Sequence, residues 1–125
     1  MPPRILIVDD APAIRRVFTH TLTRSGMEVV EADNGRLALQ LAMKHLPQAI
    51  VTDIEMAEMD GVELVRAVRA NAATRSAKIV IVSANLMQRG FAVLEAGCDA
   101  VLEKPCPPHL LVNTLKWLLG TSEES

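Results

Sequence analysis

Several apolar runs in this chain of 125 residues end in a side chain that could take part in chemistry. Two of these runs end in carboxylates, one ends in a hydroxyl group and one ends in an ammonium group. The residues are Asp9, Asp10, Asp53, Ser83 and Lys104. Further acidic side chains follow Asp53 in the stretch IVTDIEMAEMDG. An acidic turn directly after an apolar run is either a solvated loop or a site for a cation or a phosphoryl group.

The elements that must position these groups alternate along the chain. Near-continuous Ile and Val runs of strand length are typical of parallel strands that are covered on both faces. They lie at residues 4–9, 27–32, 48–53, 78–83 and 99–104. Helical spacing of apolar residues separates them and continues after the last run, to about residue 119. Gly90 predicts a weak or short fourth helix, since an interior glycine costs about 1 kcal/mol relative to alanine.

This alternation predicts one doubly wound α/β domain with a five-stranded parallel sheet and five helices. We place its core at about residues 4–119 and a polar end at 120–125. In such folds ligands bind beyond the carboxyl ends of the strands, where the strand order switches. The five residues named above end four different strands, so we expect them to meet at one edge of the sheet.

Three carboxylates at one place repel one another unless a positive charge compensates them. A divalent cation with oxygen ligands, Mg²⁺ for preference, would do so, and Mn²⁺ would suit the same ligands. Lys104 adds a compact positive charge and Ser83 adds a hydroxyl donor. A nucleophilic carboxylate, a metal, a cation and a hydroxyl together favour phosphoryl transfer, in which catalysis is mostly positioning and charge neutralisation.

Composition argues against two classes of partner. Thirteen Lys and Arg against fifteen Asp and Glu give a net charge of −2, which offers no footprint for nucleic acid. The apolar run before Asp9 is too short for a signal sequence or a membrane span. We therefore expect a soluble cytoplasmic protein. Cys98 and Cys106 are expected to be reduced, since they have no disulfide or metal-site pattern.

As a set, the motifs DD at 9–10, D at 53 with DG at 60–61, SA at 83–84 and KP at 104–105 resemble a known family. The chain is similar to the receiver domain of two-component response regulators over residues 4 to about 119. The resemblance implies a single receiver domain over residues 1–125, with strand order 2-1-3-4-5. Each motif alone would be weak, but the set at these spacings is specific.

The resemblance also implies a role for each residue of the site. Asp53 would be the phosphorylated residue, and Asp10 and Asp53 would bind Mg²⁺ directly. Asp9 would bind mostly through water, and the backbone carbonyl of Glu55 would complete the ligands. Ser83 and Lys104 would contact the phosphoryl oxygens, and the Lys104–Pro105 peptide would be cis.

The implied reaction is attack by Asp53 on the phosphohistidine of a partner histidine kinase or phosphotransfer protein. Small phosphodonors should also serve, because the receiver carries the catalytic groups for its own phosphorylation and dephosphorylation. It would not be an enzyme that acts on a separate substrate. The product would switch protein contacts with a downstream target or an output domain, and phosphorylation-dependent dimerisation is one form of such a switch.

In this family the output surface is usually formed by the fourth helix, the fifth strand and the fifth helix. Met87, Phe91, Leu110 and Trp117 lie on the corresponding helices. Apolar residues at helical spacing usually belong to the core, so we predict that most of these four are buried. Trp117 is the one that we expect to be exposed.

Three positions concern the switch. Val101 stands three residues before Lys104, where the family usually has Tyr or Phe, and an aliphatic side chain cannot make the inward swing of that ring. Glu55 and Asn85 lie two residues beyond Asp53 and Ser83. Side chains there can hinder or orient the hydrolytic water, so we predict that they set the lifetime of the acyl phosphate.

Other classes stay open at this stage. A haloacid-dehalogenase-type phosphatase also uses an aspartate with Mg²⁺, but it places a D-x-D motif after the first strand and needs a cap. A flavin carrier needs a phosphate loop after the first strand, which this chain lacks. A degenerate receiver would keep the pocket and signal without phosphate. Nothing after residue 119 resembles an output domain, so either a stand-alone regulator or a piece of a longer chain fits.

Overall fold

The computed structural model describes residues 2–120, so residues 121–125 of the expected polar end lie outside the described part. Strands and helices alternate along the whole described chain. The strands are β1 (Arg4–Val8), β2 (Glu28–Ala32), β3 (Ala49–Thr52), β4 (Lys78–Ser83) and β5 (Ala100–Glu103). The helices are α1 (Pro12–Arg24), α2 (Gly35–His45), α3 (Gly61–Ala70), α4 (Leu86–Ala96) and α5 (Pro108–Leu119).

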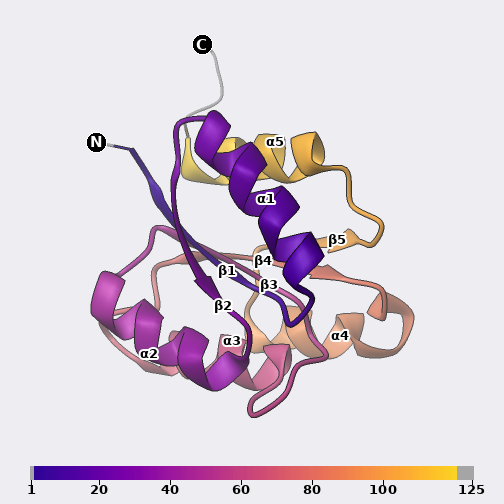
Figure 1. Cartoon of the computed structure of the whole chain (residues 1–125). Helices are drawn as coiled ribbons and strands as arrows, with labels where there is room; N and C mark the ends of the chain where they lie inside the picture. Colours follow the sequence, from indigo (N-terminus) through magenta and orange to yellow (C-terminus); the bar gives the residue numbers. More distant parts are fainter. Residues whose placement is uncertain (1, 121–125) are drawn as a thin grey trace.

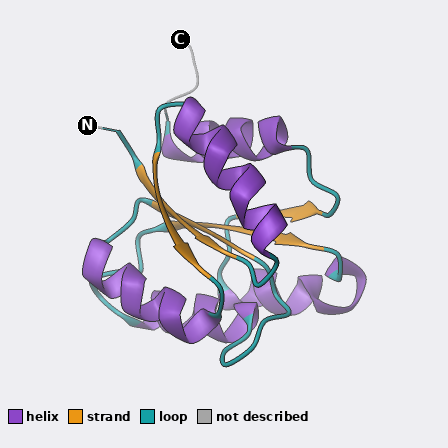
Figure 2. Ribbon diagram, viewed as in Figure 1, coloured by secondary structure: helices purple, strands orange, loops and turns teal. Residues whose placement is uncertain are grey.

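The five strands form one parallel sheet in the order β2-β1-β3-β4-β5. Helices α1 and α5 cover one face of this sheet, and α2, α3 and α4 cover the other (Figures 1 and 2). Two apolar clusters fill the spaces between the sheet and its two helical layers. The doubly wound fold, the strand order and the number of helices are confirmed.

Helix α3 begins at a well-defined cap that fixes the loop after β3. The side chain of Asp60 accepts a hydrogen bond from the backbone N–H of Glu63 at 2.9 Å. The Glu63 carboxylate in turn accepts one from the N–H of Asp60 at 3.0 Å. Such a reciprocal capping box holds the first turn of a helix in place. The loop between Asp53 and α3 is therefore anchored at its far end.

A close backbone approach anchors the same loop to the site. The amide of Gly61 donates to the carbonyl of Ile54 at 2.8 Å. A side chain on Gly61 would collide with the backbone carbonyl of Asp53. Glycine at position 61 is thus required by space, because the start of α3 lies directly against the end of β3.

Helix α4 differs from its prediction. Gly90 predicts a short helix, yet α4 spans eleven residues with Gly90 buried in its interior. Tertiary packing of Val93, which is fully buried, outweighs the weak local propensity. The helix that follows Ser83 is therefore a regular element.

The expectation that Met87, Phe91, Leu110 and Trp117 belong mostly to the core is wrong. Met87 is 96% exposed, Phe91 78%, Trp117 73% and Leu110 42%. Helix α4 is apolar on more than one side, and Gly90 and Val93 occupy the buried side, so Met87 and Phe91 lie outside. Helix α5 buries Leu111, Val112 and Leu115 and leaves Leu110 and Trp117 outside. Trp117 is exposed, as predicted.

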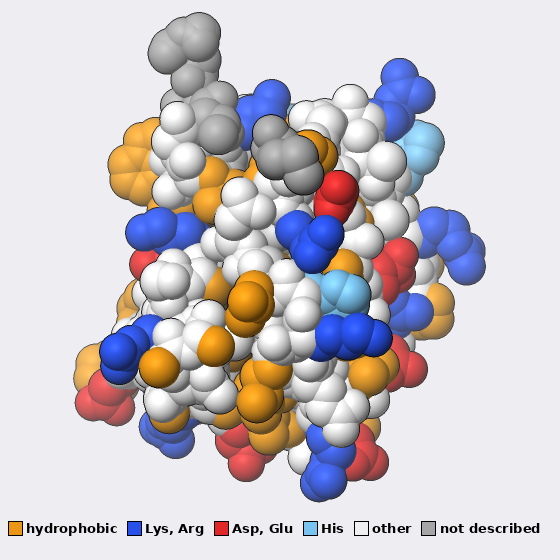
Figure 3. Space-filling model, turned by 90° about the vertical axis from the view of Figure 1, so that its left-hand side faces the viewer, with side chains coloured by type: hydrophobic (Ala, Val, Ile, Leu, Met, Phe, Trp, Pro, Cys, Tyr) orange, Lys and Arg blue, Asp and Glu red, His pale blue; other side chains and the backbone are white. Residues whose placement is uncertain are grey.

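The face at the amino ends of the strands, seen in Figure 3, carries Lys, Arg, Asp and Glu side chains interspersed with small apolar groups. Arg69 is the main polar link there. Its guanidinium donates to the backbone carbonyls of Gly97, Arg75 and Ala77 and to the carboxylate of Asp99, at 2.6–2.9 Å. Among the described helices, none combines the length and the apolar character that a membrane span requires.

Candidate functional site

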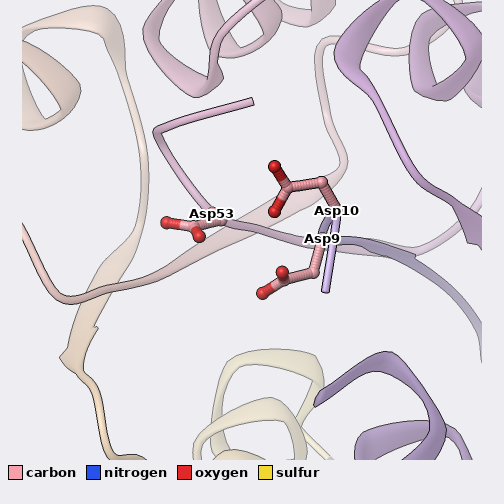
Figure 4. A group of neighbouring side chains, drawn as sticks. All are labelled: Asp9, Asp10 and Asp53. Carbon is pink, nitrogen blue, oxygen red and sulfur yellow. The ribbon is translucent and has the colours of Figure 1, made fainter. Parts of the chain in front are cut away.

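Three aspartates converge at the carboxyl ends of two neighbouring strands. Asp9 and Asp10 follow β1, and Asp53 follows the adjacent strand β3. One carboxylate oxygen from each lies within 4.8 Å of the other two, and Figure 4 shows the three side chains around a common space. Asp9 and Asp53 are buried, whereas Asp10 is exposed. The sheet edge thus concentrates negative charge where the strand order switches.

Lys104 reaches this cluster from the end of β5. Its Nζ donates to Oδ2 of Asp53 at 2.8 Å and to Oδ2 of Asp9 at 3.0 Å. Burial of the ammonium group opposes its charge, but the hydrogen bonds to Asp53 and Asp9 raise the pKa of Lys104 above its ordinary value. The lysine is thus held charged between the two buried carboxylates.

The remaining oxygens of the buried pair are bound by backbone amides. Oδ1 of Asp53 accepts from the N–H of Ile54 at 2.7 Å, and Oδ1 of Asp9 accepts from the N–H of Ala11 at 2.9 Å. Asp10 has no hydrogen-bond partner within residues 2–120. One positive charge stands against three carboxylates, and all of the candidate ligand atoms are oxygens. This donor set fits a hard divalent cation such as Mg²⁺.

Ser83 lies at the end of β4, next to β3, and is 1% exposed. Its hydroxyl oxygen accepts a hydrogen bond from the backbone N–H of Asn85 at 3.0 Å. The backbone N–H of Lys104 donates to the carbonyl of Ser83 at 3.0 Å, which fixes the lysine beside the serine. The Lys104–Pro105 peptide is cis.

Glu55 and Asn85 meet at the rim of the site. The amide nitrogen Nδ2 of Asn85 donates to Oε2 of Glu55 at 3.1 Å. Nη1 of Arg89 donates to the same oxygen at 2.7 Å, and Nη2 donates to Oδ2 of Asp60 at 3.0 Å. The hydrogen bond to Asp60 raises the pKa of Arg89. Partial burial works against ionisation of Asp60, but the Glu63 amide and Arg89 lower the pKa of its carboxyl.

Sequence reasoning assigned no role to Arg89 or Arg15. Nη1 of Arg15 donates to the backbone carbonyl of Asp9 at 2.7 Å, while its Nε pairs with Glu31 at 3.1 Å. Both arginines lie on helices, where charged residues are usually solvated. The spacing does offer one signal: Arg89 follows Asn85 by four residues, which places both on one side of α4.

An apolar groove of about 550 Å³ borders the site on the side of Lys104. The first half of α1 and the segment after β5 line it, and its residues include Ile14, Val17, Phe18, Pro105 and Cys106. Cys106 and Cys98 are both free thiols, as expected. Burial raises the pKa of each, so neither has the character of a reactive thiolate. Val101 is partly buried and packs against the cluster under α2, α3 and α4.

The fold and the acidic cluster define a class of α/β domains that gather carboxylates beyond the carboxyl ends of parallel strands. The chain belongs to the response regulator receiver domain family, whose model matches residues 5–116. It is a receiver domain of the kind found in two-component systems.

Relatives agree with this assignment over nearly the whole chain. A chemotaxis protein CheY homolog of Campylobacter jejuni is 36% identical over 94% of this chain and 93% of its own length. A putative response regulator from Chloroflexus aurantiacus has a TM-score of 0.90 and 33% identity, and the match covers 96% of this chain and 99% of that one.

A second similar structure comes from Pseudomonas aeruginosa. It is the receiver domain of a sensor histidine kinase with a magnesium ion coordinated in the active site cleft. It has a TM-score of 0.89 and 28% identity, with 96% of this chain and 99% of that chain covered.

Proposed function

We propose that the chain is a phosphorylation-controlled switch in which Asp53 accepts a phosphoryl group from a phosphohistidine. The observation that carries the proposal is the Asp53 carboxylate, buried beside two further aspartates and held at 2.8 Å by Lys104. An Asp53 oxygen would form the new bond to phosphorus while the bond between phosphorus and the donor's imidazole nitrogen breaks. The electron pair of that bond returns to the imidazole, and the product on this chain is an acyl phosphate.

Asp9, Asp10, Asp53 and the backbone carbonyl of Glu55 would hold Mg²⁺, for which Mn²⁺ could substitute. When bound, the metal would neutralise charge on the phosphoryl oxygens and on the three carboxylates. The excess of carboxylates over cations at this edge supports this assignment, as does the magnesium ion described for the Pseudomonas aeruginosa relative.

Lys104 and Ser83 would bind the transferred phosphoryl group. Lys104 already neutralises Asp53, so its ammonium group is in reach of a group attached to that carboxylate. Ser83 ends the neighbouring strand, and its hydroxyl can donate a hydrogen bond while it accepts one from Asn85. Together they offer a positive charge and a donor where the negative charge would build up.

We propose a histidine kinase or a histidine phosphotransfer protein as the donor. The apolar groove beside Lys104 supports a protein donor, because Val17 on its wall is 50% exposed and available for contact. The output would be a change in contacts with a downstream protein or an attached domain. Val101 would make this switch differ from that of relatives with an aromatic residue there.

Glu55 and Asn85 are proposed to tune the lifetime of the acyl phosphate. Their side chains are joined at 3.1 Å at the rim of the site, where water must approach. Exchange of both for alanine should change the half-life of the phosphorylated protein, measured by the decay of the adduct mass. An unchanged half-life would contradict this part of the proposal.

The test of the proposed function is intact mass after incubation with Mg²⁺ and acetyl phosphate. The account expects a single phosphoryl adduct on the wild-type chain, none on Asp53→Asn and none when a chelator removes the metal. Asp33→Asn is a matched control, since Asp33 is an exposed aspartate outside the cluster. An adduct that persists on Asp53→Asn, or no adduct on the wild type, would contradict the proposal.

A further inference from the structure

A polar bridge crosses the rim of the site from the loop after β3 to helix α4. Glu55 and Asp60 lie at either end of that loop, and both accept hydrogen bonds from the single guanidinium of Arg89. Asn85, at the start of α4, binds the same oxygen of Glu55. One arginine of α4 thus ties down two carboxylates of the segment that follows Asp53.

The bridge continues to Ser83 without a gap. The backbone N–H of Asn85 donates to the Ser83 hydroxyl at 3.0 Å, and the side chain of Asn85 donates to Glu55 at 3.1 Å. A movement of the Ser83 hydroxyl or of Glu55 therefore acts on the first turn of α4. Arg89, one turn further along, connects the same helix to the start of α3 through Asp60.

The pair between Arg89 and Asp60 is more shielded than an ordinary surface ion pair, whereas Glu55, the other partner of Arg89, is 57% exposed. The side chain of Arg89 is 30% exposed and that of Asp60 is 29% exposed. By contrast, Arg36 pairs with Glu58 of the same loop at 3.3 Å, with exposures of 69% and 55%. Isolated exposed pairs contribute little, whereas a shared, partly shielded cation contributes more. Arg36 is consequently a matched control on the other side of the loop.

A phosphoryl group on Asp53 would disturb this bridge by its charge. The phosphoryl group carries close to two negative charges, but it replaces the single charge of the Asp53 carboxylate, so the site gains about one negative charge. Glu55, two residues away, would be repelled by that charge, and Arg89 would be attracted to it. Because Arg89 lies in α4, a change in its pairing shifts the helix. The outward side of α4 carries the exposed Met87, Phe91 and Leu94, so the shift would reach the surface.

We infer that Arg89 is a positioning residue that transmits the state of Asp53 to helix α4, acting through Glu55 and Asp60. This inference rests on the proposed function, since it requires that Asp53 be modified. The charged bridge would then couple Asp53 to helix α4. Val101 has no ring and cannot provide this coupling by a side-chain swing.

Hydrogen exchange of the α4 peptide, read by mass spectrometry with Mg²⁺ and with or without acetyl phosphate, tests the inference. Intact mass on the same samples reports the fraction phosphorylated. We expect the wild type and Arg36→Met to show an α4 exchange rate that changes by about fivefold or more on phosphorylation, typical of a coupled pair of sites. In Arg89→Met the adduct should still form while this change is lost.

Two further variants test the inference even if Arg89→Met does not fold. Glu55→Gln removes the charge at the other end of the pair and should also weaken the α4 response. Arg89→Lys keeps the positive charge but not the planar fork that binds two carboxylates, so it should restore the response only in part.

The outcomes separate the two proposals. A full α4 response in phosphorylated Arg89→Met and Glu55→Gln would overturn the inference and leave the proposed function intact. Loss of the adduct itself in Arg89→Met would also overturn it, because Arg89 would then act on phosphorylation. No adduct on the wild type would refute the proposed function and this inference with it.

Discussion

Lys104 lies at the carboxyl ends of the strands, here called the carboxyl edge of the sheet, and Arg69 lies at their amino ends, the amino edge. The two cationic side chains bind different kinds of group. At the amino edge, Arg69 binds three backbone carbonyls and one carboxylate, that of Asp99. At the carboxyl edge, Lys104 binds two buried carboxylates, with the third carboxylate of the cluster, Asp10, close by. The charge and the hydrogen-bond donors of Arg69 are matched by the groups around it. The three carboxylates around Lys104, by contrast, carry more negative charge than one lysine neutralises.

This difference in charge balance indicates that the contacts of Arg69 stabilise the fold, whereas the excess carboxylates around Lys104 favour a cationic ligand. The carbonyls around Arg69 are neutral, so the groups that Arg69 binds at the amino edge need no further cation. The three aspartates around Lys104 repel one another, and a protein keeps such a cost where function needs it. Predictions about the two edges therefore differ in one respect: only the carboxyl edge should respond to Mg²⁺.

The largest expected effect comes from Lys104→Met. Asp53 and Asp9 would be left buried without a cation, which should lower the free energy of unfolding by about 4 kcal/mol in metal-free buffer. Because Mg²⁺ supplies a replacement charge, part of this loss should be recovered when it is added. Urea unfolding with and without Mg²⁺ measures both values. An equal loss in the two buffers would contradict the charge argument.

Gly61→Ala tests how tightly the site loop is packed. The added methyl group would meet the carbonyl of Asp53, so the free energy of unfolding should fall by about 3 kcal/mol. Gly90→Ala is the control, because a methyl group there meets only Leu86 at 3.9 Å and should stabilise α4 by about 0.5–1 kcal/mol. Thermal unfolding distinguishes the two signs. Similar midpoints for both variants would argue against the close approach.

Arg69→Met breaks the contacts at the amino edge. It removes hydrogen bonds to three carbonyls and to Asp99, and we expect a loss of about 2 kcal/mol in the free energy of unfolding. The loss should be the same with and without Mg²⁺, and the phosphoryl adduct should still form. A loss that Mg²⁺ reverses would show that the two edges are not distinct.

The smallest effect concerns the pH dependence of the Asp60 pair. The pKa of Asp60 is lowered in the fold, so its contribution is present above its unfolded pKa and is lost as the pH falls through its folded value. At neutral pH, Asp60→Asn keeps the helix cap but loses the Arg89 pair, which costs about 0.5–1 kcal/mol. The gap between variant and wild type should shrink as the pH falls below the ordinary aspartate pKa of about 3.9. A gap that does not depend on pH would exclude the ion pair as its cause.

The sequence predicts most of the fold because its local signals agree with one another. Runs such as KIVIVS are typical of covered parallel strands, and helical spacing of apolar residues separates them. The convergence of Asp9, Asp53 and Lys104 follows from the rule that parallel strands end at one edge. These residues are close in space because of the topology, which the order of elements determines.

Contacts between long side chains and the choice of outward face could not be predicted in this way. Arg89 reaches Glu55 across 34 residues of sequence, and no periodicity encodes that pairing. Helix α4 is apolar on more than one side, so spacing alone cannot tell that Val93 is buried and that Met87 and Phe91 are exposed. Such choices depend on how much volume the neighbouring helices leave.

Of the three aspartates at the carboxyl edge, Asp53 is the one that we expect to carry the phosphoryl group. Borohydride reduction of the protein treated with Mg²⁺ and acetyl phosphate tests it most directly, since reduction turns an acyl phosphate into an alcohol that marks the residue. Peptide mapping by tandem mass spectrometry should find the mark at Asp53 and at none of the other aspartates. A mark at Asp9 or Asp10, or none at all, would contradict the account.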